Sequence, residues 1–258
     1  MLNRLIFILL LAGSLPAAEL KPLIVASEVW PPYVTDRSDL PGFDVEVSRR
    51  VLADLGYDLQ LRLMPWRRAL VHAKSREVDA VLDAFDGPDR HAWLYYPDEP
   101  LSTSTSSLFC HDCDRTSAPG LEELTNAIVA VNRGYQYSDA FDAHPGIDRV
   151  EVGSFRQGFM LLARGRVDYY AINNRVGLFT LQQMDEASDF RLLTPPIAPV
   201  EPVYLVFAHK PGLEALSRRF SERLAEFKQT EDYRAILARY GIVEDGGANP
   251  ALGLAPVE

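Results

Sequence analysis

Aromatic residues beside prolines, in the run Trp30-Pro31-Pro32-Tyr33, are the first side chains suited to binding chemistry. A strand-like apolar run at 23–26 precedes this turn, and proline makes such a turn rigid. Flat rings at the mouth of a sheet can stack on a small molecule. Aromatic-proline turns also fill ordinary cores, so the motif alone leaves both interpretations open.

Two cysteines, Cys110 and Cys113, are separated by only two residues. In an oxidising compartment such a pair most often forms a small local disulfide. Thioredoxin-like redox sites have the same spacing, but they lie where a strand meets the start of a helix. Here the pair follows a predicted strand and precedes a polar loop at 114–120, so we predict a structural bridge. A zinc site that included His111 would lack a second pair of ligands.

The elements that must position these residues follow from alternating apolar strands and amphipathic helices. The predicted strands cover 23–26, 59–64, 80–84, 102–109, 128–131, 149–152, 169–172 and 203–208. The predicted helices cover 44–55, 66–76, 137–144, 155–164, 176–184, 213–228 and 232–239. This alternation predicts an α/β fold whose sheets are mostly parallel and flanked by helices.

The pattern starts again in the second half of the chain. Residues 76–80 (Arg-Glu-Val-Asp-Ala) resemble residues 165–169 (Gly-Arg-Val-Asp-Tyr), and each run lies between a helix and an apolar strand. Two similar α/β lobes are the natural inference.

Charge and the N-terminal pattern limit the possible functions. The 258 residues carry a formal net charge of -10, which argues against nucleic acid as a partner because no basic patch can offset the phosphates. Residues 1–18 are predicted to be a secretory signal peptide, since Arg4 precedes an apolar run too short to span a membrane. We therefore expect a periplasmic protein, with a disordered tail at 244–258 that is rich in Gly, Ala and Pro.

Eight short motifs occur in a fixed order along residues 23–242. They are 30–33 (Trp-Pro-Pro-Tyr), 42–45 (Gly-Phe-Asp-Val), 64–66 (Met-Pro-Trp), 77–81 (Glu-Val-Asp-Ala-Val), 88–90 (Pro-Asp-Arg), 97–98 (Pro-Asp), 165–168 (Gly-Arg-Val-Asp) and 240–242 (Tyr-Gly-Ile). Each motif is weak alone. In this order and spacing they resemble the periplasmic solute-binding proteins of extracellular family 3, the amino-acid-binding type.

The resemblance implies a type II periplasmic-binding-protein fold, in which two lobes close on a ligand by a hinge motion. Lobe 1 would comprise residues 19–109 and 203–243, and lobe 2 would comprise residues 110–202. The strands 102–109 and 203–208 would cross between the lobes. It further implies a monomer without a cofactor that delivers its ligand to the membrane permease of an ABC transporter.

Several site residues follow from the same resemblance. Arg90 matches the family arginine that holds a ligand carboxylate, a task that suits the planar guanidinium. The alternative for Arg90 is a surface ion pair with Asp86 or Asp89. Trp30, Tyr33 and Trp66 are candidate walls of the cleft.

Other candidates carry open alternatives. Asp44 either contacts the ligand or caps the first helix. Arg133 and Tyr135 lie in a second-lobe turn whose backbone N–H groups can hold an anion, although Arg133 is also explained as a solvated side chain.

Two departures from the family pattern affect the ligand. The second-lobe position that commonly holds an aspartate for the ligand ammonium falls on Asn173, which carries no charge. The hydroxyl residues expected before the family arginine are absent, and Asp83 stands among their replacements. Asp83 can meet a cationic ligand from the first lobe instead.

Three functions compete. The leading one is a binding protein for a small polar solute, an amino acid or a related carboxylate or amine. The second is an enzyme, because some proteins on this scaffold resemble cyclohexadienyl dehydratases, which carry a glutamate after the second-lobe aspartate. Residues 173–176 are Asn-Asn-Arg-Val and contain no such glutamate, so we expect no enzyme. The exception would be that Asp83 or Asp86 acts as an unrecognised acid. The third is a sensor that presents its closed form to a receptor.

Overall fold

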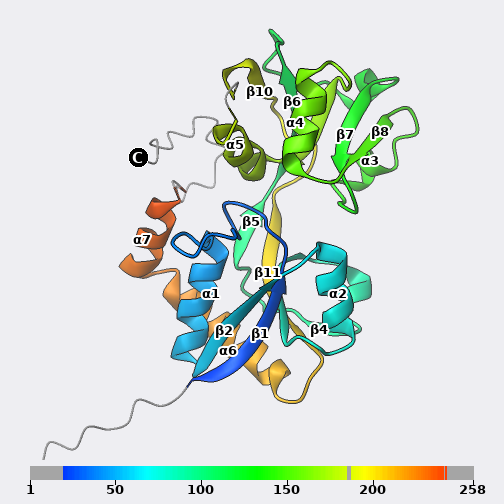
Figure 1. Ribbon diagram of the computed structural model, residues 1–258. Coiled ribbons are helices and arrows are strands. Elements are labelled where there is room, and N and C mark those ends of the chain that lie inside the picture. The colour runs from blue at the N-terminus through cyan, green and yellow to red at the C-terminus, as the bar shows by residue number, and fades with distance from the viewer. Residues whose placement is uncertain (1–19, 185–186, 241, 243–258) are drawn as a thin grey trace, which may run out of the picture.

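The chain folds as two α/β lobes, each built on one mixed sheet (Figure 1). The structure is a computed structural model that describes residues 20–184, 187–240 and 242. The predicted signal peptide and the predicted tail lie outside these residues. Among the described residues, no helix has the length and apolar character needed to cross a bilayer.

The first sheet has the strand order β2-β1-β3-β11-β4, and β5 also pairs with β11. Its strands are β1 (Lys21–Ser27), β2 (Tyr57–Leu63), β3 (Ala80–Phe85), β4 (Leu94–Tyr95), β5 (Ser102–Ser104) and β11 (Glu201–Ala208). β1 is parallel to β2 and β3, whereas β11 runs antiparallel to β3. The helices of this lobe are α1 (Phe43–Asp54), α2 (Trp66–Lys74), α6 (Leu213–Phe227) and α7 (Glu231–Arg239), with a short 3₁₀ turn at Pro88–Arg90.

The second sheet has the strand order β10-β6-β9-β7-β8. Its strands are β6 (Ser106–His111), β7 (Ile128–Asn132), β8 (Asp148–Val152), β9 (Tyr169–Asn173) and β10 (Phe190–Leu192). The helices are α3 (Asp139–Asp142), α4 (Phe155–Ala163) and α5 (Asn174–Gln182), with 3₁₀ turns at Leu121–Leu124 and Ala187–Asp189. The predicted elements therefore exist, but β4 and β10 are additional, and α3 is shorter than the helix predicted at 137–144.

The strand predicted at 102–109 is divided in two by Thr105. β5 pairs with β11 in the first sheet, whereas β6 pairs with β9 in the second. Thr105 itself lies at the crossing, where its hydroxyl donates to the Ala198 carbonyl at 2.9 Å and its carbonyl accepts from the Asn174 N–H. The chain thus leaves lobe 1 at residue 105 and not after Phe109, because the backbone must twist out of one sheet to join the other. Figure 1 shows β5 and β11 side by side between the lobes.

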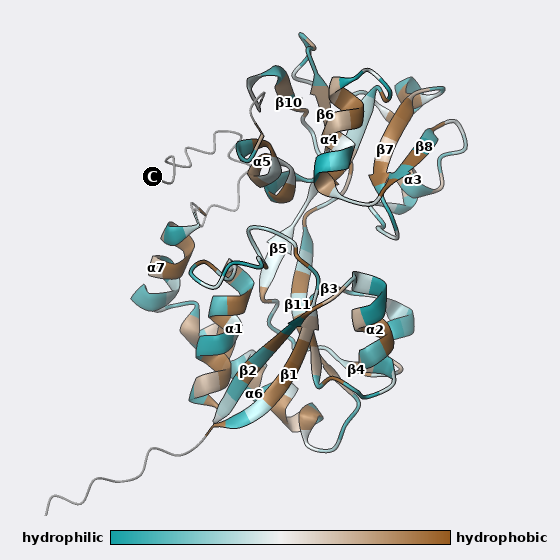
Figure 2. Ribbon diagram, in the orientation of Figure 1, coloured by the Kyte–Doolittle hydropathy of each residue, from teal (hydrophilic) through white to brown (hydrophobic). Residues whose placement is uncertain are grey.

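Stretches of β1 and β7 are apolar, whereas α1 and α2 carry both apolar and polar residues (Figure 2). In α1 the residues at helical spacing, Val47, Val51 and Leu52, are fully buried. The C-terminal helices pack back on lobe 1, where the Tyr240 hydroxyl donates to Glu46 and accepts the backbone N–H of Gly42. This packing ties the start of α1 to the residue that follows α7, and the Phe43 N–H at that start donates to the Pro32 carbonyl of the aromatic-proline turn.

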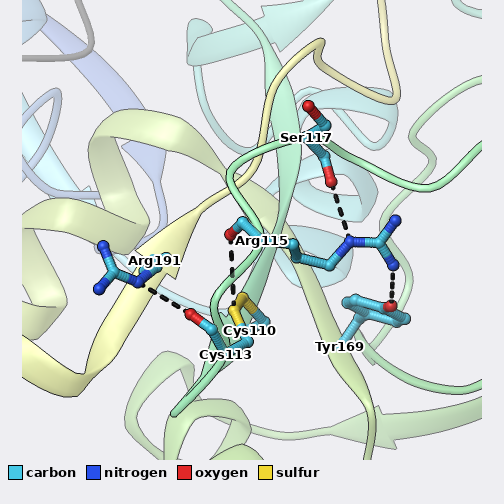
Figure 3. The surroundings of a disulfide bond; sticks show 6 residues. All are labelled: Cys110, Cys113, Arg115, Ser117, Tyr169 and Arg191. Atoms are coloured by element: carbon cyan, nitrogen blue, oxygen red, sulfur yellow. Dashed lines mark hydrogen bonds between the residues drawn. A yellow bond between two sulfur atoms is a disulfide. The ribbon is translucent and has the colours of Figure 1, made fainter.

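Cys110 and Cys113 form a disulfide, which confirms the predicted bridge (Figure 3). Cys110 lies in β6 and is buried, whereas Cys113 lies in the exposed loop that follows. Arg191 in β10 donates to the Cys113 carbonyl at 2.9 Å, so the bridged loop is also held by the neighbouring strand. That the bridge does no redox work remains a prediction.

Candidate ligand-binding site

A cavity of about 940 Å³ lies between the lobes, and residues of both lobes line it. From the first lobe these are Ser27, Glu28, Trp30, Trp66, Asp83 and residues 85–90. From the second lobe they are residues 134–139, Asp142 and Ala143, and the returning crossing segment adds Pro199 and Glu201. The first-lobe residues follow the carboxyl ends of β1, β2 and β3, where α/β sheets place their ligands.

The aromatic-proline turn serves both of the roles left open by the sequence. Trp30 and Tyr33 stack with their ring centroids 4.4 Å apart, and both are buried. Trp30 lines the cavity, whereas Tyr33 lies behind it and donates its hydroxyl to the Thr103 carbonyl. Tyr33 is therefore a supporting residue, and Trp30 is the ring that a solute can reach.

Arg90 lines the cavity beside Trp66. Its guanidinium carbon lies 5.8 Å from the centre of the Trp66 ring, and one N–H donates to the Phe85 carbonyl at 3.1 Å. The surface pairing considered from the sequence does not form, because Asp86 contacts His91 instead at 2.6 Å. No carboxylate of residues 20–184, 187–240 and 242 is paired with Arg90, so its remaining donors are available to an anion.

Asp83 and Asp44 form a buried acidic pair at the inner end of the cavity. Asp44 is 0% exposed and accepts from the Ser102 hydroxyl at 2.7 Å, and Asp83 is 6% exposed with the Asp44 carboxyl as its hydrogen-bonding neighbour. Burial and the neighbouring Asp44 raise the pKa of Asp83 well above its ordinary value. Burial also raises the pKa of Asp44, to about 6. Of the two, Asp83 lines the cavity.

The raised pKa of Asp44 makes stability depend on pH. Its pKa is about 6 in the folded chain and 3.8 otherwise, so the folded state prefers the protonated carboxyl. The contribution of the protonated Asp44 carboxyl to the free energy of unfolding is fully present below pH 3.8. It is lost as pH rises through 6, because the buried carboxyl must then ionise in the folded state. We expect Asp44→Asn to remove this loss and to stabilise the chain by about 3 kcal/mol at pH 8, relative to the same comparison at pH 4. Asparagine keeps an oxygen for Ser102.

Urea unfolding at pH 4, 6 and 8 measures this effect. Asp58→Asn, at an exposed position of β2, is the matched control and should leave the pH profile unchanged. If the free energy of unfolding changed with pH in the same way for the wild type and Asp44→Asn, the raised pKa of Asp44 would be contradicted.

Glu28 and Tyr135 join the two lobes across the cavity. The Tyr135 hydroxyl donates to Glu28 at 2.6 Å, and the other Glu28 oxygen accepts from the Trp66 N–H at 3.4 Å. Burial raises the pKa of Glu28. Glu28 was not identified from the sequence, although its position directly after β1 is a signal that could have found it.

Arg133 and Asn173 have other partners. Arg133 is exposed and pairs with Glu151 of β8 at 3.2 Å, and it does not line the cavity. Asn173 caps α5 by accepting from the Val176 N–H at 2.9 Å and donates to the Ser104 hydroxyl at 2.5 Å. It borders a small adjoining hollow of about 20 Å³, not the main cavity. The Arg133 side chain thus lies on the surface, in line with its interpretation as a solvated residue, and an anion held by the backbone N–H groups of the turn stays a prediction.

Acidic residues of α3 and of the start of β11 complete the lining. Asp139 and Asp142 belong to α3, and Glu201 begins β11. We call these three residues the acidic wall. Burial, Asp139 and Asp142 raise the pKa of Glu201, and burial also raises the pKa of Asp142.

Comparison with known proteins agrees with this geometry. The sequence profile of the bacterial extracellular solute-binding proteins, family 3, matches residues 23–243. The chain belongs to this family. No curated protein matches the chain in a sequence comparison.

Solved structures show that this solute-binding protein shares its fold with proteins of several roles. A histidine kinase sensor domain with similarity to periplasmic binding proteins has a TM-score of 0.71 at 23% identity and covers 86% of this chain and 96% of its own. The substrate-binding protein of an amino acid ABC transporter has a TM-score of 0.69 at 18% identity, with 85% and 98% covered. An ancestral arginine-binding protein bound to arginine has a TM-score of 0.71 at 20% identity, with 86% and 99% covered. At these identities the likeness establishes the type II periplasmic-binding-protein fold alone.

Proposed function

We propose that this protein is exported to the periplasm and captures a small polar solute, an amino acid or a related carboxylate or amine, for an ABC-type transporter. The observation that carries the proposal is the cavity of about 940 Å³, whose walls come from both lobes. A solute that contacts both walls would stabilise the closed arrangement, because its contacts differ between the open and closed states.

Each wall offers a distinct contact. Arg90 would bind a ligand carboxylate through its free donors, and Trp66 and Trp30 would cover its apolar parts. The Glu28–Tyr135 hydrogen bond would close the lobes over the ligand. A monomer without cofactor suffices for this task.

A second candidate rests on the buried acidic pair. A carboxyl with a raised pKa in a cleft is the kind of group that acts as a general acid, and Asp83 is such a carboxyl. An enzyme of the cyclohexadienyl dehydratase type is therefore the alternative function. Mass spectrometry of the ligand released after long incubation separates the two. Recovery of the unchanged compound supports binding alone, and recovery of a product supports the enzyme.

A thermal-shift screen with amino acids, polyamines and organic acids tests the proposal. A true ligand at 100 times its dissociation constant stabilises the folded protein by about 2.7 kcal/mol. Failure of every compound to raise the melting temperature would contradict solute capture. Permease and ATPase genes beside this gene would support transport, and an isolated gene would support a sensor.

A further inference from the structure

The lining of the cavity has a strong excess of negative charge. Seven of its residues are acidic, four from the first lobe, two from α3 and one from β11, and Arg90 is its one basic residue. A neutral amino acid, with one carboxylate and one ammonium, would leave most of this charge uncompensated. The excess of negative charge therefore favours a positively charged ligand.

Some of these acids already have partners. Asp86 contacts His91, Glu28 accepts from Tyr135 and Trp66, and Asp142 accepts from the backbone N–H of Tyr137 at 2.8 Å. These contacts explain the positions of three acids without a ligand.

Asp83 has no such explanation. Both of its oxygens are buried, its hydrogen-bonding neighbour is a second acid, Asp44, and no cation is paired with it among the described residues. Arg175, the cation that approaches the pair from lobe 2, lies over the Tyr33 ring at 5.9 Å and lowers the pKa of Asp44. A buried carboxylate without a partner costs several kcal/mol, and an ammonium or guanidinium group is the partner that removes this cost.

The acidic wall is a second group of acids in the same lining. Asp139 and Asp142 stand one helical turn apart on α3, and the returning strand brings Glu201 toward them. The side chains of Asp139 and Glu201 make no hydrogen bond or ion pair with the described residues. One cavity is thus lined both by Asp83 of β3 and by the acidic wall of α3 and β11.

We propose, resting on the function proposed above, that the ligand is a small organic cation with two or more amine or guanidinium groups. One cationic group binds Asp83, and a second binds the acidic wall. Arg90 adds a site for a carboxylate where the ligand has one, so a cationic amino acid and a linear polyamine both fit. The cation-binding carboxylate thereby lies in the first lobe, where Asp83 takes the part that Asn173 cannot perform.

Isothermal titration calorimetry with L-arginine, spermidine, L-glutamine and L-glutamate tests this inference. We expect arginine or spermidine to bind at least about tenfold more tightly than glutamine and glutamate. Tightest binding by glutamate or glutamine would overturn the inference and leave the proposed function standing. No binding by any of the four, while the thermal-shift screen finds another ligand, would also overturn the inference alone, and no ligand in either experiment would contradict both.

Asp83→Asn tests the assigned carboxylate. Asparagine tolerates the positive φ of 64° at this position, so the variant should fold, which thermal unfolding checks. We expect it to weaken the tightest cation at least about tenfold, because the amide keeps the size of the carboxylate but lacks its charge and replaces one acceptor oxygen with an NH2 donor. Asp148→Asn, at an exposed position of β8, is the matched control and should bind as the wild type does. Equal affinity of the cation for Asp83→Asn and wild type would overturn the role of Asp83.

Discussion

Arg90→Ala is expected to abolish the binding of a carboxylate ligand while leaving the fold intact. Arg90 has no carboxylate partner in the part of the chain that the structure describes, and its guanidinium is already held over Trp66 by the Phe85 carbonyl. Removing one partner of a desolvated charge pair costs on the order of 2–5 kcal/mol, which corresponds to about 30-fold or more in affinity. Calorimetry with L-arginine and L-glutamate measures the loss.

Arg133→Ala is the matched control. Arg133 was a candidate from the sequence, but its side chain pairs with Glu151 on the surface, so its loss should leave affinity unchanged. A ligand without a carboxylate, such as spermidine, should also bind Arg90→Ala normally. Unchanged affinity of Arg90→Ala for a carboxylate ligand would remove this arginine from the site.

Gly42→Ala is expected to cause a large loss of stability. Gly42 has φ of 113°, and a Cβ there would lie 2.2 Å from the Tyr33 carbonyl oxygen. Backbone atoms cannot move aside without breaking the turn that carries Trp30. The strain and the clash together should cost about 3 kcal/mol or more and lower the melting temperature by several degrees.

Gly56→Ala separates strain from the clash. Gly56 has φ of 88°, but nothing lies within 4 Å of the Cβ position, so only backbone strain of about 1–2 kcal/mol is added. Thermal unfolding of both variants should show the larger loss for Gly42→Ala. Similar losses in the two variants would mean that the turn at Tyr33 yields easily to the added methyl group.

The fold could be predicted from the sequence wherever an apolar run or helical spacing was long enough. β1, β3 and α6 lie within about two residues of their predicted bounds. β4 and β10 have only two and three residues, too few to establish a period. The division of the predicted strand at Thr105 could not be predicted from the sequence either, because the residues on both sides of Thr105 are suited to an extended backbone.

The site was predicted only in part. Arg90, Trp30, Trp66, Asp83 and Tyr135 do line the cavity, because each lies close to the end of a strand. The Arg133 side chain points toward its ion-pair partner Glu151 on β8. The local sequence pattern around Arg133 does not show that β8 lies beside it. The acidic wall joins residues about 60 positions apart in the chain, which meet only because β11 returns past α3. Such groupings follow from topology, and a single sequence contains no local signal for them.

Hydrogen-exchange mass spectrometry, with and without the tightest ligand of the thermal-shift screen, tests the central claim most directly. Capture between the lobes predicts that the ligand slows exchange both in peptides covering 83–90 and in peptides covering 134–143, which form the two walls of the cavity. Peptides of the outer strand β8 should exchange at the same rate in both states. Slowed exchange in one wall only, or in neither wall, would contradict capture of the solute in the interlobe cavity.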